Sequence, residues 1–117
     1  MKCIVIFLIL VAASARLEAH AFLKDANPGV GSTTQTSPSE VRIRFTDNIE
    51  PAVSSIQVFD ASGKEVDKHD LHLDRSDNAL LHVSLPPLGA GDYKVVWRVV
   101  SVDTHVTSGN FTFRVVR

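Results

Sequence analysis

Three side chains in this sequence could together bind a metal ion: His20, Asp103 and His105. A histidine at the first position of a chain offers two nitrogens, the α-amine and the imidazole Nδ1, which close a six-membered chelate ring. A carboxylate and a second imidazole add one oxygen and one further nitrogen. Three nitrogens and one oxygen suit the tetragonal geometry of Cu(II), whereas Cu(I) prefers sulfur. The donor set therefore predicts a site for one Cu(II) ion per chain.

The first nineteen residues decide whether His20 can be a first residue. Lys2 supplies a positive charge, residues 4–13 form an apolar run, and residues 14–19 are polar and rich in small residues. This is the layout of a secretory signal peptide, and Leu17 and Ala19 form an acceptable cleavage site. We expect a signal peptide over 1–19 and a mature domain over 20–117, with cleavage after Ala13 or Ala15 as the alternative.

The composition of the predicted mature chain limits the metal ligands and partners that it can have. The only cysteine, Cys3, and the only methionine, Met1, both precede the cleavage site. The mature chain then has no disulfide, and it has neither the thiolate nor the thioether ligands of a Cu(I) site. The apolar run is well short of the roughly 20 residues that span a bilayer. The net charge of −1 and the absence of basic runs give no electrostatic case for nucleic acid.

Alternating apolar residues predict the elements that would carry these ligands. Val41, Ile43 and Phe45 alternate with polar residues, which places one apolar face on a strand. Similar patterns predict further strands over 54–60, 79–85, 93–102 and 110–116, whereas 65–77 reads as a loop or an irregular edge strand. No stretch predicts an amphipathic helix. We expect one all-β domain, an antiparallel sandwich or barrel, with a central strand over 93–102 and Trp97 in the core.

Asp103 and His105 come at the end of the predicted strand over 93–102. Residues two apart on a strand point to the same face, roughly 6 to 7 Å apart at the backbone, so a carboxylate and an imidazole could converge on one ion. An Asp-x-His pair alone is common on surface strands. It becomes specific when it is combined with an N-terminal histidine.

The sequence resembles the CopC family of periplasmic copper-binding proteins over nearly all of residues 20–117. The matching segments are HAFL at 20–23, NPG at 27–29, VRIRFT at 41–46, GDYKVVWRVVSVDTH at 91–105 and VTSGNFTF at 106–113. The resemblance implies an immunoglobulin-like Greek-key β-sandwich or barrel. It also implies a Cu(II) site with His20 as bidentate anchor, Asp103 as carboxylate ligand and His105 as second imidazole. A periplasmic role in copper homeostasis or resistance is implied as well, with a CopD-type inner-membrane protein as a partner. Some members of the family also carry a Met-rich Cu(I) segment, which this sequence lacks.

The other histidines give weaker evidence of a metal site than His20 and His105. His69 and His72 are three residues apart, a spacing that does not share a strand face, so a second metal site there is a weak hypothesis. His82 falls on the polar face of its strand, where we expect a solvated surface residue. The nearby aspartates lack the ordered spacing of a calcium loop; they are Asp67, Asp70, Asp74 and Asp77.

Two functions compete with copper binding. Copper monooxygenases that attack polysaccharides also use an N-terminal histidine brace, but they need an open equatorial position, which Asp103 would fill. A β-sandwich for adhesion or carbohydrate binding would need no metal. We expect a monomeric binding protein and not an enzyme; whether it buffers, imports or delivers copper stays open.

Overall fold

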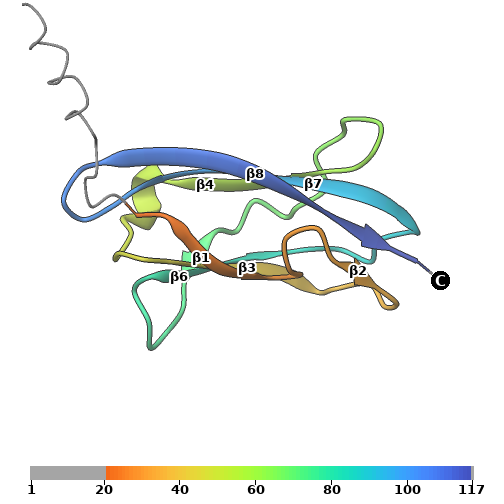
Figure 1. The fold of residues 1–117 in the computed structure, drawn as a ribbon, viewed down its shortest axis with the longest axis horizontal. Helices are drawn as coiled ribbons and strands as arrows, with labels where there is room; N and C mark the ends of the chain where they lie inside the picture. Colours follow the sequence, from red (N-terminus) through yellow and green to blue (C-terminus); the bar gives the residue numbers. More distant parts are fainter. Residues whose placement is uncertain (1–20, 117) are drawn as a thin grey trace, which may run out of the picture.

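Two four-stranded β-sheets pack face to face in the computed structural model, which describes residues 21–116 (Figure 1). One sheet has the strand order β1-β3-β6-β5 and the other the order β2-β8-β7-β4, with β2 and β8 as the parallel pair. The elements are β1 (Leu23–Asn27), β2 (Thr33–Thr34), β3 (Glu40–Phe45), the 3₁₀ turn η1 (Pro51–Val53), β4 (Ser55–Phe59), β5 (His72–Leu73), β6 (Leu80–Ser84), β7 (Gly91–Val100) and β8 (Val106–Val115). The predicted all-β sandwich is confirmed.

The strands predicted from alternation are all present, and two others, β1 and β2, were missed. β1 and β2 had no clear pattern, because β1 is mostly polar with a register shift between Leu23 and Asp25, and β2 has two residues. β5 lies at a sheet edge within the stretch predicted as a loop or irregular edge strand. β8 begins at Val106, earlier than the predicted start at Asn110. Within the described residues, no helix is long and apolar enough to cross a membrane.

The core lies between the sheets and is built from the apolar faces of the strands. β7 is central, flanked by β8 and β4, as predicted. Trp97 on β7 is 7% exposed, and its ring meets that of Phe45 edge-on, with centroids 5.1 Å apart. This pair joins the two sheets, because Phe45 belongs to β3 and Trp97 to β7.

The long β7–β8 ladder carries the candidate ligands to one end of the sandwich. The two strands pair from Gly91 opposite Val115 to Val100 opposite Val106. The chain therefore reverses over residues 101–105, in a loop at the end where the described chain begins and where η1 lies (left in Figure 1). Asp103 and His105 belong to this loop and not to a strand, so the predicted same-face strand geometry is wrong. The strand ends sooner because the chain turns back at Ser101, whose carbonyl accepts the Thr104 N–H.

Candidate metal centre

The β7–β8 loop is a tight reversal held by its own backbone. The Thr104 N–H donates to the Ser101 carbonyl at 2.8 Å, and the Ser101 N–H donates to the His105 carbonyl at 2.9 Å. Thr104 adopts a left-handed conformation with φ of 72°, which is uncommon for a residue with a side chain. This turn at the middle residue brings its two neighbours together.

Asp103 and His105 meet in this loop. Asp103 Oδ1 lies 3.2 Å from His105 Nδ1 and 3.4 Å from the His105 backbone nitrogen. Both side chains are about half exposed, at 44% for Asp103 and 49% for His105. A carboxylate oxygen and an imidazole nitrogen thus lie close together in an accessible loop, through a turn geometry that alternation did not anticipate.

Ser101 orients the Asp103 carboxylate through a hydrogen bond. Its side chain is fully buried, and its hydroxyl donates to Asp103 Oδ1. This hydrogen bond is the main reason that the pKa of Asp103 is lowered; contacts with His105 lower it further, while desolvation acts in the opposite direction. The carboxylate is therefore held in the ionised form that a metal ligand must have.

The described chain begins beside this loop. Ala21 is fully buried, and its carbonyl accepts a hydrogen bond of 2.7 Å from the Thr107 hydroxyl, two residues beyond His105. Phe22 and Thr46 are also paired: the Phe22 N–H donates to Thr46 Oγ1 at 2.8 Å, and the Thr46 N–H donates to the Phe22 carbonyl at 2.9 Å. The contact with Thr107 ties the backbone at Ala21 to β8, the strand that follows His105. The predicted ligand His20 and the predicted signal peptide lie outside the described residues.

Sequence reasoning missed the residues that support this site. Ser101 and Thr107 carry no motif, and each acts through a contact with a residue or loop that only the fold brings close. A weak signal was present at Ser101, a polar residue in the apolar stretch 99–102, two residues before Asp103.

The histidines outside the β7–β8 loop, His69, His72 and His82, have different neighbours. The His72 ring stacks on His82, with centroids 5.2 Å apart, and His72 Nδ1 lies 2.8 Å from the Asp70 carbonyl oxygen. His69 instead contacts Glu65 and Asp67. The structure therefore does not bring His69 and His72 together as a pair of ligands.

The prediction that His82 is a solvated surface residue is wrong. Its side chain is 13% exposed, with Nδ1 3.0 Å from Glu40 Oε1 and Nε2 2.8 Å from Asp74 Oδ1. β6 lies between β3 and β5, so its polar face is covered by side chains from neighbouring segments. Asp70 is also engaged, because its Oδ1 accepts the Ser84 N–H at 2.7 Å. Asp74 is engaged in the same way, because its Oδ2 accepts the Ser76 N–H at 3.0 Å.

Comparison with known proteins identifies the family. The CopC domain model matches residues 23–116. The chain is 29% identical over 104 residues to copper resistance protein C of Escherichia coli, covering 83% of this chain and 82% of that protein. It is 28% identical over 113 residues to copper transport protein CutJ of Bacillus subtilis, covering 96% of this chain but only 21% of CutJ.

Solved structures of CopC and PcoC proteins are similar to this chain in fold. CopC from Methylosinus trichosporium OB3b has a TM-score of 0.73 at 36% identity, covering 82% of this chain and 93% of that one. PcoC, a methionine-rich copper resistance protein from Escherichia coli, has a TM-score of 0.75 at 30% identity, covering 84% of this chain and 100% of that one. A two-sheet sandwich of matching topology and a family match over nearly the whole described chain lead to one conclusion: this chain belongs to the CopC domain family.

Proposed function

We propose that this protein binds one Cu(II) ion through the α-amine and imidazole of His20, the carboxylate of Asp103 and the imidazole of His105. The observation that carries the proposal is the 3.2 Å contact between Asp103 and His105 in an exposed loop, beside the backbone of Ala21. The relatives named as copper resistance and copper transport proteins support copper as the ion.

The available donor atoms support Cu(II) in particular. PcoC is described as methionine-rich, whereas the single methionine of this chain is Met1 and its single cysteine is Cys3. Nitrogen and oxygen donors suit Cu(II), and Cu(I) would lack soft ligands in residues 20–117. The metal chemistry of this chain is therefore proposed to differ from that of a methionine-rich relative.

The proposed role is to hold and pass on copper without chemical turnover. Removal of residues 1–19 during export to the periplasm frees the His20 amine, and a CopD-type inner-membrane protein is the proposed recipient. Asp103 would occupy the equatorial position that an oxygen-activating copper enzyme leaves open. The protein is therefore proposed to act in copper homeostasis or resistance as a binding protein.

Electron paramagnetic resonance with one equivalent of Cu(II) tests this proposal. The protein beginning at His20 should give a type 2 copper spectrum with several nitrogen ligands. His105→Ala and an alanine inserted before His20 should each change that spectrum and weaken binding at least on the order of 100-fold, about 2.7 kcal/mol. His72→Ala, which removes an imidazole outside the loop, should leave both unchanged. An extended protein that held copper as tightly, with the same spectrum, would contradict the proposal.

A further inference from the structure

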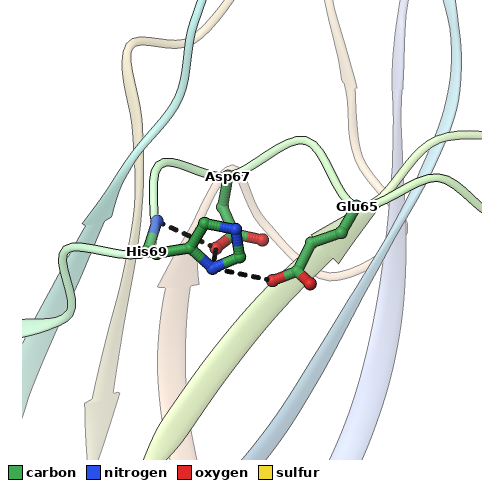
Figure 2. A group of neighbouring side chains, drawn as sticks. All are labelled: Glu65, Asp67 and His69. Atoms are coloured by element: carbon green, nitrogen blue, oxygen red, sulfur yellow. Dashed lines mark hydrogen bonds and ion pairs between the residues drawn. The ribbon is translucent and has the colours of Figure 1, made fainter.

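A second group of metal-binding side chains lies in the segment between β4 and β5. Glu65, Asp67 and His69 each direct one donor atom toward a common point, and these three atoms lie within 4.8 Å of one another. Figure 2 shows the two carboxylates and the imidazole pointing toward one another. The group contains no residue of the β7–β8 loop.

Asp67 is the fixed member of this group. Its side chain is 1% exposed, and its Oδ1 accepts a hydrogen bond of 2.8 Å from the Val58 N–H on β4. Its Oδ2 is turned toward His69, whose backbone N–H donates to it at 3.3 Å (Figure 2). A carboxylate anchored to a strand through one oxygen presents the other at a defined position, which is how a ligand is oriented before the metal arrives.

The neighbouring backbone brings the other two donors to Asp67. Glu65 bridges to Phe59 at the end of β4, and Gln57 Nε2 donates to Glu65 Oε1 at 3.4 Å. His69 has a left-handed backbone with φ of 57°, which turns its ring back over the segment. His69 Nδ1 consequently lies 3.4 Å from Glu65 Oε2 and 3.7 Å from Asp67 Oδ2.

The two separations from His69 Nδ1 are close to those that a tetrahedral metal requires. Zinc binds imidazole nitrogen and carboxylate oxygen at roughly 2.0–2.2 Å, so two of its ligand atoms lie about 3.3–3.5 Å apart. The two separations from His69 Nδ1 therefore need to shorten by a few tenths of an ångström at most. Side-chain rotation at His69, which is 69% exposed, can supply that change.

The electrostatics and the opening of the site also favour a cation. The Glu65 and Asp67 carboxylates both lie beside His69, and the Asp67 side chain is buried. Two adjacent carboxylates, one of them buried, are stabilised by a positive charge placed between them. All three side chains line an open cavity of about 360 Å³, through which an ion and its remaining water ligands can enter.

We propose that Glu65, Asp67 and His69 bind a divalent transition-metal ion, with Zn²⁺ as the ion best matched to one imidazole nitrogen and two carboxylate oxygens. Water completes the coordination. Borderline and hard donors of this kind do not select Cu(I). The site uses no N-terminal amine and so does not depend on where the mature chain begins.

Zn²⁺ titration followed by ¹H–¹⁵N NMR tests the proposal. The protein is used both unmodified and with His105→Ala, so that any Zn²⁺ bound at the β7–β8 loop is counted separately. In both backgrounds, we expect one saturable equivalent of Zn²⁺ that shifts the backbone amides of residues 65–69. Glu65→Gln and His69→Ala should each weaken this binding at least on the order of tenfold.

Two further variants make the outcome decisive. Asp67→Asn keeps an oxygen acceptor for the Val58 N–H, so it should remain folded while losing zinc affinity. His72→Ala, three residues beyond His69, is the matched control and should bind Zn²⁺ normally. Equal losses in His69→Ala and His72→Ala, or shifts at 65–69 that saturate with unchanged affinity in His69→Ala, would overturn the proposal and leave only an ion pair. Because the copper test depends on His105 and this test does not, either proposal can fail without the other.

Discussion

Ser101 is the residue on which the Asp103 carboxylate depends most directly. It is fully buried under the β7–β8 loop, and its hydroxyl donates to Asp103 Oδ1. Such a contact fixes the direction of the carboxylate and favours its ionised form. Ser101 is thus a positioning residue: it supports a proposed ligand without being one.

Ser101→Ala should weaken Cu(II) binding roughly 10- to 100-fold, the range found when a residue that supports a metal ligand is removed. It should also raise the pKa of Asp103 in the metal-free protein, because the main cause of its lowering is lost. Competition titration with a copper chelator and carboxyl ¹³C NMR measure the two effects. Ser62→Ala is the control, since Ser62 makes a similar contact with Asp60 in another turn. An unchanged affinity together with an unchanged Asp103 titration would show that Ser101 has no positioning role.

The pairing of β7 with β8 decides where the loop between them stands. Trp97 on β7 lies directly opposite Gly109 on β8, and its ring covers the glycine. A Cβ at position 109 would lie 2.6 Å from Trp97 Cζ2 and 2.9 Å from Cε2, closer than real side chains approach. The glycine therefore lets a large core side chain lie flat against the neighbouring strand.

Gly109→Ala should lower the free energy of unfolding by about 1–3 kcal/mol, because the indole or the strand must move to admit the methyl group. Gly89→Ala is the control: no atom lies within 4 Å of the added Cβ, so its effect should be small. Trp97 is the only tryptophan of the chain, so urea unfolding followed by its fluorescence measures both variants. Equal stability of Gly109→Ala and the unmodified protein would contradict the close packing.

The sandwich as a whole is held partly by carboxylates that must stay ionised. Asp74 is the clearest case: its pKa is lowered to about 2, chiefly by its hydrogen bond to His82 on β6 and then by contacts with Ser76. The pKa values of Asp60 and Asp70 are also lowered, mainly by hydrogen bonds from Ser62 and Ser84 respectively. A carboxylate with a lowered pKa in the folded state stabilises the fold at pH values above its unfolded pKa, and this stabilisation is lost as the pH falls through the folded value.

Acid should therefore destabilise the protein between about pH 4 and pH 2, and Asp74 should contribute to the loss. At pH 6, Asp74→Asn should be less stable than the unmodified protein, because it lacks the charged partner of His82. The difference between them should narrow as the pH approaches 2, where Asp74 itself takes up a proton. Urea unfolding at pH 6, 4 and 2.5 measures this. A stability difference that stayed constant over that range would show that Asp74 is not linked to folding in this way.

Contacts between segments that are distant in the sequence explain which features could not be predicted from it. Strands β1 and β5 gain their hydrogen bonds from β3 and β6, so their own short or polar sequences carry little signal. His82 reads as an exposed residue because Glu40 and Asp74, which cover it, lie 42 and 8 residues away. Likewise Glu65, Asp67 and His69 form one cluster only because Asp67 is anchored to β4 and His69 turns its backbone back.

The amino-acid sequence alone determined the fold class, the core and the donor types. Side chains alternate across a strand, so β3, β7 and β8 showed their buried faces directly, with Trp97 among them. The sequence also identified Asp103 and His105 as donors. Only the tertiary structure decided how these donors meet, because their 3.2 Å contact arises from a left-handed Thr104 and a buried Ser101 hydroxyl. Ligand geometry depends on turn dihedrals and long-range contacts, which side-chain periodicity does not encode.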